Sequence, residues 1–461
     1  MTYDYHGQWD KKTGHVAPMY TLPNEPTPTF NANFSLHYWV SRGADRKKVI
    51  FGMPMYGQSF TLADKNQNGL NSQTYGGAEA GENTRARGFL AYYEICEKIQ
   101  KNGWQVVRDR KKRIGPYAFK GDQWVGFDDQ AMIHHKSEFV KYNDLGGAMI
   151  WALDLDDFKN FCGCESYPLL KTINRVLRNY PGPGPNCFLK TMKHEDVPQI
   201  IHNQNDEDEM FNDDTIVIES KSINCNKSGE LFQHDGDCGK FATCENGRIK
   251  IYDCPPGLHF NLARSLCDWP FLANCDRRYR NNLKNMKTAL MPVSDRKNDV
   301  VTKEVTLMKE EPYKVLCYYT SWAYLRQGEG KYSPEDIDGS LCTHIVYAFA
   351  DLDEKELVIQ PHNTKLDLET GFYEKIIKFR SRGVQVILAM GGWVDSKSDK
   401  YSRLVNDIPA RRNFVRHVTE FLEYYGFNGL EVAWEYPKCW QANCKKGPDS
   451  DKAGFTLLMK E

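Results

Sequence analysis

Hydrophobic runs alternate with amphipathic stretches towards both ends of the chain, whereas much of its middle is polar. The clearest strand-like runs cover residues 49–55, 147–153, 314–319, 344–350, 384–389 and 429–433. Apolar residues recur at helical spacing over residues 130–142, 167–178, 372–382 and 410–425. This alternation predicts an α/β fold, with βα units around a parallel sheet in residues 1–180 and again in residues 313–461.

A stretch rich in aromatic residues and glycine, residues 57–127, lies within the first βα region. It is too long for a plain connection between a strand and a helix, so we expect an inserted subdomain there.

Two polar stretches separate the βα regions. Residues 181–224 start with Pro-Gly-Pro-Gly-Pro and continue with an acidic run, and residues 276–312 are rich in Lys, Arg and Asn. Both are interpreted as solvated linkers. An RNA-binding tail is the alternative for the basic stretch, but aromatic residues are not interleaved with its charges.

Composition narrows the function. The 461 residues include 60 Lys plus Arg and 61 Asp plus Glu, so a formal charge of -1 provides no basic field for nucleic acid. No apolar run approaches the length of about 18 residues that indicates a membrane span. The 14 cysteines favour an oxidising compartment, and we expect an extracellular, secreted protein. The sequons at Asn33 and Asn226 agree with this, and the absence of a signal peptide predicts a fragment of a longer chain.

Six cysteines gather within residues 225–275, a segment too short to bury a large core without covalent links. We expect a small disulfide-rich β module with about three disulfides, whose pairing the spacing leaves open. Zinc is disfavoured because the close cysteine pairs of a zinc site are absent, so no metal is predicted. The module's aromatic residues, Trp269 among them, either form its core or are exposed as platforms for sugar rings.

The segment 427–437 carries the most chemistry. On a strand, Glu431, Ala433 and Glu435 share one face. Burial of unpartnered carboxylates is costly, so two acids on an inward face indicate a polar site. The alternative is an exposed edge strand with solvated acids.

The cysteine-rich module resembles the peritrophin-A-type chitin-binding domain. The resemblance rests on the six-cysteine framework and on Cys-Pro-Pro-Gly-Leu-His-Phe-Asn at residues 254–261. It implies binding of chitin through surface aromatic residues and the pairs Cys225–Cys244, Cys238–Cys275 and Cys254–Cys267.

The βα regions resemble family 18 glycoside hydrolases, the chitinases and chitinase-like lectins, which are built on a (β/α)8 TIM barrel. Residues 427–437 are similar to the signature Asp-Gly-x-Asp-x-Asp-x-Glu on the fourth strand. Residues 315–322, 344–350 and 388–393 resemble strands one to three, and residues 1–4, 52–57 and 147–153 resemble strands six to eight. An α+β subdomain is expected between strands seven and eight.

The resemblance implies substrate-assisted, retaining hydrolysis of β-1,4-linked N-acetylglucosamine polymers. Glu435 is then the proton donor, with Glu431 as the second catalytic residue. Ala433 replaces the Asp that holds the substrate's acetamido group, which predicts poor hydrolysis by this copy. Asn428 and Glu431 also replace Asp residues of the signature. The residues implied to bind substrate are Met1, Tyr3, Asp4, Tyr56, Trp151, Trp322, Gly391, Gly392, Trp393 and Tyr436. No cofactor is implied.

Further disulfides are expected by analogy with the family, namely Cys317–Cys342 and Cys96–Cys162. This leaves Cys164 to pair with Cys187 and Cys439 to pair with Cys444.

The order of the segments is unusual, because strands six to eight precede strands one to four and strand five is missing. We expect parts of two tandem barrels with the chitin-binding module between them, and a circularly permuted barrel is the alternative. For function, the main hypothesis is a secreted chitin-degrading enzyme, and the alternative is a non-catalytic, lectin-like chitin-binding protein.

Overall fold

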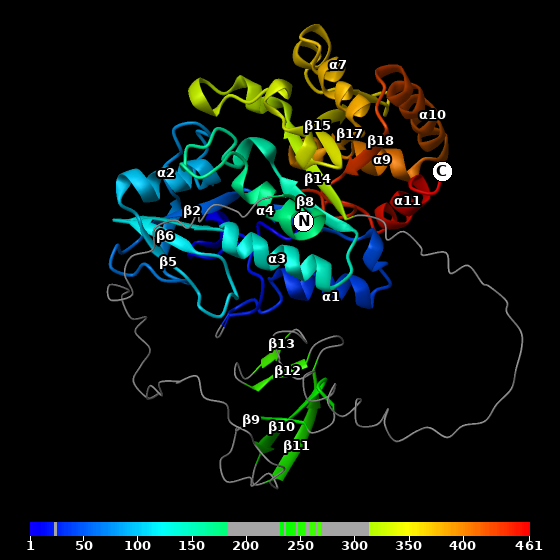
Figure 1. Ribbon diagram of the computed structural model, residues 1–461. Helices are drawn as coiled ribbons and strands as arrows, with labels where there is room; N and C mark the ends of the chain where they lie inside the picture. Colours follow the sequence, from blue (N-terminus) through cyan, green and yellow to red (C-terminus); the bar gives the residue numbers. More distant parts are fainter. Residues whose placement is uncertain are drawn as a thin grey trace, which may run out of the picture. The chain divides into compact units, whose positions relative to one another are not determined.

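The computed structural model in Figure 1 describes residues 1–22, 25–181, 231–234, 237–245, 248–254, 259–262, 266–268 and 313–461. The chain divides into two compact units, and each is described by itself. Apart from Pro181, the predicted linkers 181–224 and 276–312 lie outside the described residues.

The larger unit is built around a mostly parallel sheet, which confirms the α/β class and the barrel-like fold. Its parallel strands follow one another in the order β1 (Ile50–Pro54), β8 (Gly147–Trp151), β14 (Lys314–Thr320), β15 (His344–Leu352), β17 (Gln385–Gly391) and β18 (Gly429–Ala433). A short strand, β16 (Ile359–Pro361), pairs antiparallel with β15. Strands β1 and β8 are buried along nearly their whole length, as expected for a parallel sheet with both faces covered.

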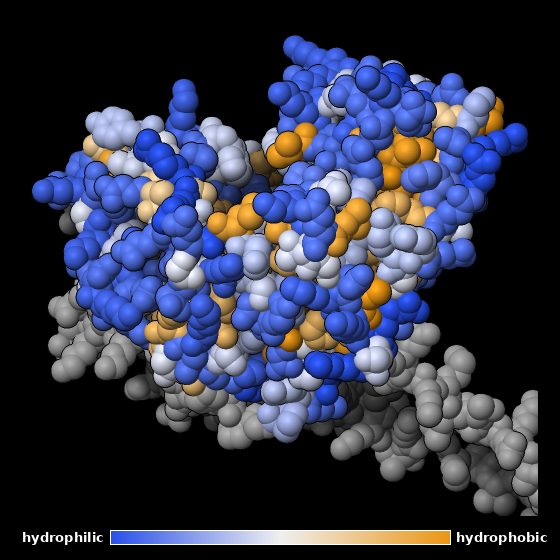
Figure 2. Space-filling model, turned by 90° about the horizontal axis from the view of Figure 1, so that it is seen from above, coloured by the Kyte–Doolittle hydropathy of each residue, from blue (hydrophilic) through white to orange (hydrophobic). Residues whose placement is uncertain are grey.

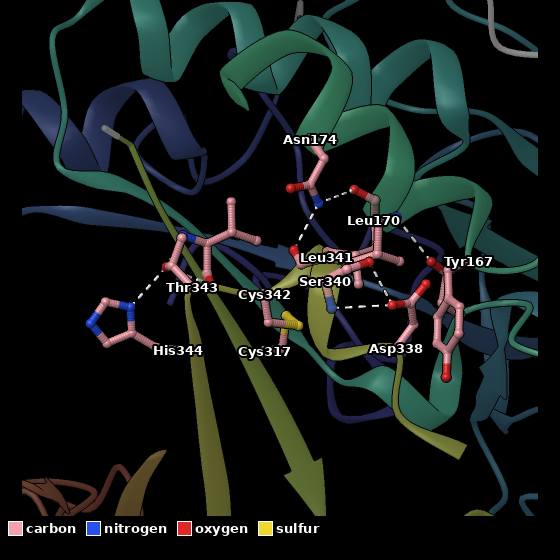
Figure 3. The surroundings of a disulfide bond; sticks show 12 residues. Tyr167, Leu170, Asn174, Cys317, Asp338, Ser340, Leu341, Cys342, Thr343 and His344 are labelled. Carbon is pink, nitrogen blue, oxygen red and sulfur yellow. Dashed lines mark hydrogen bonds between the residues drawn. A yellow bond between two sulfur atoms is a disulfide. The ribbon is translucent and has the colours of Figure 1, made fainter. Parts of the chain in front are cut away.

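The two βα regions share this sheet. Strand β8 pairs in parallel with β14, from Gly147 opposite Lys314 to Ile150 opposite Cys317. Figure 3 shows a second connection, in which the side-chain amide of Asn174 donates a hydrogen bond of 2.9 Å to the Leu341 carbonyl beside the Cys317–Cys342 disulfide. The tandem arrangement and the permuted barrel both stay predictions, because the described sheet runs from β1 to β18 without a pairing between these two end strands.

Helices cover the sheet on the outside, as Figure 1 shows. The α-helices of this unit are α1 (Ala32–Ser41), α2 (Tyr92–Asn102), α3 (Gln130–Tyr142), α4 (Pro168–Arg178), α7 (Phe372–Ile377), α8 (Gly392–Asp395), α9 (Lys400–Asn406), α10 (Ile408–Tyr425) and α11 (Ser450–Leu458). Short 3-10 helices cover Gln8–Asp10, Arg46–Lys48, Leu153–Leu155, Ser321–Leu325, Gly328–Gly330, Pro334–Asp336, Gly339–Leu341 and Lys378–Arg382, and a π-helix covers Lys365–Glu369. None of the helices in the described part of the chain is long and apolar enough to cross a bilayer.

Two predicted helices differ from the observed ones at their ends. Helix α10 begins two residues before the predicted start because Asp407 caps it, accepting a hydrogen bond of 2.9 Å from the Ala410 amide. The predicted helix 372–382 changes at Lys378 from α-helix to 3-10 helix.

The predicted subdomain is present as a second, antiparallel sheet. Its strands are β2 (Tyr56–Leu62), β3 (Thr74–Gly77), β4 (Phe89–Ala91), β5 (Gln105–Val107), β6 (Tyr117–Lys120) and β7 (Gln123–Phe127). They bury a cluster made of Phe60, Leu62, Tyr117, Phe119 and Trp124. The predicted Cys96–Cys162 disulfide links α2 of this subdomain to the segment after β8.

Residues 1–4 were expected to form the sixth strand, and this prediction is wrong. The segment runs beside β1, where the Thr2 hydroxyl donates to the Gly52 carbonyl at 2.5 Å, but it joins no backbone ladder. Asp4 has a φ of 58°, a left-handed conformation that cannot continue a strand.

The smaller unit contains two short antiparallel sheets. Strand β10 (Lys240–Glu245) lies between β9 (Leu231–Gln233) and β11 (Arg248–Asp253), and β12 (His259–Asn261) pairs with β13 (Leu266–Asp268). The predicted Cys254–Cys267 disulfide is present, and the rings of Phe241 and Phe260 stack at 4.8 Å.

The other cysteine predictions have different outcomes. Cys439–Cys444 is present as predicted. Trp269, Cys187, Cys225 and Cys275 lie outside the described residues, so the pairs Cys225–Cys244, Cys238–Cys275 and Cys164–Cys187 stay predictions.

Candidate active site

Most predicted site residues gather where the parallel strands end. Trp151 is the last residue of β8, Tyr318 lies near the end of β14, and Gly391 is the last residue of β17. Glu431 lies on β18, and Glu435 lies two residues beyond the end of that strand. The carboxyl ends of parallel strands meet at one edge of a sheet, which is where barrel enzymes carry their active sites.

Glu431 is held by a tyrosine of another strand of the same sheet. The Tyr318 hydroxyl donates a hydrogen bond to its Oε1 atom, which ties β18 to β14 across two intervening strands. Burial raises the pKa of the Glu431 carboxyl, and the hydrogen bond from Tyr318 partly offsets this effect.

Glu435 is fixed through both its backbone and its side chain. Its backbone amide donates a hydrogen bond of 2.8 Å to the Ser396 hydroxyl. Burial raises the pKa of its carboxyl, the hydrogen bond with Tyr436 lowers it, and the nearby anions of Asp4 and Glu431 raise it. The carboxyl therefore keeps its proton to a higher pH than an ordinary glutamate, as a general acid requires.

Ala433 stands between these two acids in the sequence of β18. Its methyl group can neither accept a hydrogen bond nor carry charge, so residues 428–435 present two carboxylates where the family signature has four. Glu431 and Glu435 remain electrostatically coupled across this position, because the Glu431 anion raises the pKa of the Glu435 carboxyl.

The N-terminal segment brings a further acid to the same place. Asp4 accepts hydrogen bonds at its Oδ1 atom from the Tyr56 hydroxyl at 2.8 Å and from the Gln58 amide at 2.9 Å. Burial raises the pKa of Asp4, and these two hydrogen bonds partly offset the rise. The Tyr3 and Tyr56 rings lie 6.1 Å apart. Gln58 was missed by the sequence reasoning, and its only signal was a polar residue within a buried strand.

Aromatic rings form a cluster beside the acids. The Trp151 ring lies 5.0 Å from the Tyr318 ring, 5.9 Å from the Phe349 ring and 6.3 Å from the Trp322 ring. Trp322 remains 38% exposed, so one side of the cluster is open to a ligand. Phe349 was also missed, because a hydrophobic residue near the end of a buried strand carries no distinct signal.

The glycines at the end of β17 allow close packing at the site. Gly391 has a φ of 116°, and a side chain there would approach the Ala433 carbonyl to 2.7 Å. Gly392 has a φ of 82°, and a side chain there would meet the Phe349 ring at 2.7 Å. Both positions therefore require glycine.

The other residues predicted to bind substrate lie at the margin of this cluster of acids and rings. Trp393 and Tyr436 are 48% and 39% exposed, and Met1 is exposed beside Gly52 of β1. Figure 2 shows a face of the molecule on which hydrophobic residues gather in a hollow between hydrophilic parts.

Two other observations concern metal ligands and cavities. Within the described residues, no group of three or more His, Cys, Asp or Glu could hold a metal ion. An open cavity of about 440 Å³ lies at the opposite, amino end of the sheet, where Ile377, Arg380 and Gln385 line it, and it is separate from the acids.

Two buried acids and a cluster of aromatic rings thus lie at the carboxyl end of a barrel-like parallel sheet. Residues 1–156 and 314–461 match the family described as glycosyl hydrolases family 18, and residues 225–275 match the chitin binding peritrophin-A domain. The first match covers more than half of the chain, so the protein belongs to family 18 of the glycosyl hydrolases. Both resemblances noted in the sequence are thereby confirmed.

Two relatives show how the similarity is distributed. A probable chitinase 10 of Drosophila melanogaster is 51% identical over 470 residues, which cover 100% of this chain and 20% of that protein. An oviduct-specific glycoprotein of Bos taurus is 42% identical over 195 residues, which cover 41% of this chain and 35% of that protein. The chain thus spans only a minor part of each of these relatives.

Solved structures match over similar shares. The second catalytic domain of a group II chitinase from Ostrinia furnacalis is 58% identical, with a TM-score of 0.40, over 41% of this chain and 49% of that chain. Human YKL-39, described as a pseudo-chitinase with retained chitooligosaccharide binding, is 39% identical with a TM-score of 0.37, over 38% of this chain and 49% of that chain.

Proposed function

We propose that the larger unit binds β-1,4-linked N-acetylglucosamine chains at the carboxyl end of its sheet and hydrolyses them poorly. The observation that carries this proposal is Ala433 between Glu431 and Glu435. A buried acid with a raised pKa and an aromatic cluster are in place, whereas the group between the acids is a methyl.

In the proposed reaction, the substrate's own acetamido oxygen attacks the anomeric carbon while the glycosidic bond breaks. Glu435 gives its proton to the leaving oxygen, and water later opens the cyclic intermediate with retention of configuration. Tyr56 and Asp4 are proposed to contact the acetamido group, and Trp151 to support the sugar ring. An Asp at position 433 would hold the acetamido N–H and stabilise the positive charge of the intermediate. Alanine supplies neither interaction.

A second candidate function is recognition of chitin without turnover, as in a lectin. Ala433 is the specific observation that favours it, because the groups proposed to bind sugar do not depend on this residue. The peritrophin-A match supports chitin as the partner, and Tyr252, which is exposed on β11, is a candidate contact there. Trp269 stays a predicted contact. We also propose an extracellular location, which the disulfides support.

The test is Ala433→Asp in the full chain, assayed on a fluorogenic chitooligosaccharide. We expect turnover to rise by about 10²- to 10³-fold, the scale of restoring one group that stabilises charge in the transition state. Ala433→Asn is the matched control, because it has nearly the same shape without the charge, and it should recover much less. No gain from Asp would remove Ala433 as the cause of poor hydrolysis. Absence of oligosaccharide binding by the unmodified chain would overturn the proposal itself.

A further inference from the structure

A buried carboxylate outside β18 connects the two segments that carry Trp151 and Trp322. Asp154 lies in the 3-10 helix Leu153–Leu155, three residues after Trp151, and is fully buried. Its Oδ1 atom accepts a hydrogen bond of 2.8 Å from the Thr320 hydroxyl. Its Oδ2 atom forms an ion pair with Arg326 Nη2 at 2.7 Å.

The two partners of Asp154 flank one short element. Thr320 directly precedes the 3-10 helix Ser321–Leu325, and Arg326 directly follows it. Trp322 is the second residue of this helix. Arg326 also donates through Nη1 to the backbone carbonyl of Asp154 at 3.4 Å. A single acidic residue therefore holds both ends of the turn that carries Trp322.

Backbone pairing does not extend to this region. The ladder between β8 and β14 ends with Ile150 opposite Cys317, before Trp151 on one strand and Thr320 on the other. Beyond that point, the contacts of Asp154 cross between the two segments. The Trp151 and Trp322 rings lie 6.3 Å apart, and each lies 5.9 Å from the Phe349 ring.

We propose that Asp154 is a positioning residue that sets the spacing between Trp151 and Trp322, so that one extended sugar chain contacts both rings. The inference rests on the proposed function, because it takes that site to bind N-acetylglucosamine chains. Asp154 itself touches no substrate. Its carboxylate acts through the turn it holds, because a buried charged pair with two further hydrogen bonds fixes geometry more firmly than packing alone.

The consequence depends on the length of the ligand. A short oligosaccharide that covers only Trp151 does not need Trp322 in place, whereas a longer one spans both rings. We expect Asp154→Asn in the full chain to weaken binding of the pentasaccharide by about tenfold, because Asn keeps an oxygen that accepts from Thr320 but has no charge to pair with Arg326. Binding of the disaccharide should change by less than about twofold. Isothermal titration calorimetry with the N-acetylglucosamine disaccharide and pentasaccharide measures both.

A matched control separates positioning from stability. Asp128 is fully buried in an ion pair with Lys136, which is also fully buried, and neither residue belongs to the site. Asp128→Asn should lower the melting temperature as Asp154→Asn does, because each change removes the buried charged partner of a cation. The ratio of pentasaccharide to disaccharide affinity should remain that of the unmodified chain in Asp128→Asn and fall only in Asp154→Asn.

A double-mutant cycle tests the route through Trp322. If Asp154 acts by placing Trp322, then Asp154→Asn should weaken pentasaccharide binding no further in a Trp322→Ala background. Additive losses, or an unchanged affinity ratio in Asp154→Asn, would overturn the inference. Should Asp154→Asn fail to fold, Thr320→Val removes one hydrogen bond with little change in shape and must lower the same ratio. An unmodified chain that binds neither oligosaccharide would instead overturn the proposed function, and this inference with it.

Discussion

The N-terminal and C-terminal segments contribute unequal parts of the site. The N-terminal segment supplies a connected set in which Tyr56 and Gln58 both hold Asp4, and Trp151 packs among three other rings. The C-terminal segment supplies Glu435, the proposed proton donor, but has Ala433 where the family signature has a carboxylate. Groups suited to holding a sugar are thus more complete than groups suited to breaking its bond. Binding and turnover should therefore respond separately to mutation.

Removal of the proton donor is expected to have the largest effect. Glu435→Gln keeps the size of the side chain but has no proton to give, so turnover should fall by roughly 10²- to 10⁴-fold in the Ala433→Asp background. Oligosaccharide affinity should stay within about twofold, which calorimetry can check. Glu423→Gln, the same change on the exposed surface of α10, is the control. Unchanged turnover in Glu435→Gln would place the acid elsewhere.

Removal of the aromatic support should weaken oligosaccharide binding, which removal of the proposed proton donor should leave nearly unchanged. Trp151→Ala is expected to weaken oligosaccharide affinity by roughly 30-fold, because a central aromatic anchor is worth about 2 kcal/mol or more. Trp39→Ala is the matched control, since Trp39 is 62% exposed on α1 and belongs to no part of the site. Equal losses in the two variants would show that Trp151 is not a specific sugar contact.

Local elements of the fold were predictable from the sequence, whereas long-range pairing was not. Helix α3 has the predicted bounds because Asp129 caps it, accepting a hydrogen bond of 3.0 Å from the Met132 amide. By contrast, the pairing of β8 with β14 joins segments far apart in the chain, and hydrophobic patterning carries no information on which parallel strands become neighbours.

The candidate site shows the same division. The motif around Glu435 was readable because its acids recur at the period of a strand. Gln58, Phe349 and Asp154 were missed because their roles depend on partners from other segments, namely Asp4, Trp151 and Thr320. Residues 1–4 were assigned to a strand from their family resemblance, and the left-handed backbone of Asp4 was not visible in the sequence.

The electrostatic effect of Asp4, in the N-terminal segment, on Glu435, in the C-terminal segment, can be measured from the pH dependence of turnover. Glu435 must be protonated to act, so turnover falls as pH rises through its pKa, which burial and the anions of Asp4 and Glu431 raise above the ordinary glutamate value. Asp4→Asn removes one of these anions and should move the descending limb of kcat in the Ala433→Asp background to lower pH. Tyr56→Phe keeps the Asp4 carboxyl, so it should shift the descending limb of kcat by less than Asp4→Asn does. A limb that does not move in Asp4→Asn would show that the two segments are not coupled electrostatically.

The smallest expected effect concerns the hydrogen bond that links β18 to β14. Tyr318→Phe removes the hydroxyl that donates to Glu431, which should lower the free energy of unfolding by about 1–3 kcal/mol and raise the pKa of Glu431, since that hydrogen bond lowers it. Tyr319→Phe is the matched control on the adjacent residue, whose buried hydroxyl has no hydrogen-bond partner. Its removal should be neutral or slightly stabilising in urea denaturation, because no bond is lost and an unsatisfied polar group leaves the interior. Equal destabilisation by both changes would mean that ring packing, rather than the bond to Glu431, attaches β18 at this point.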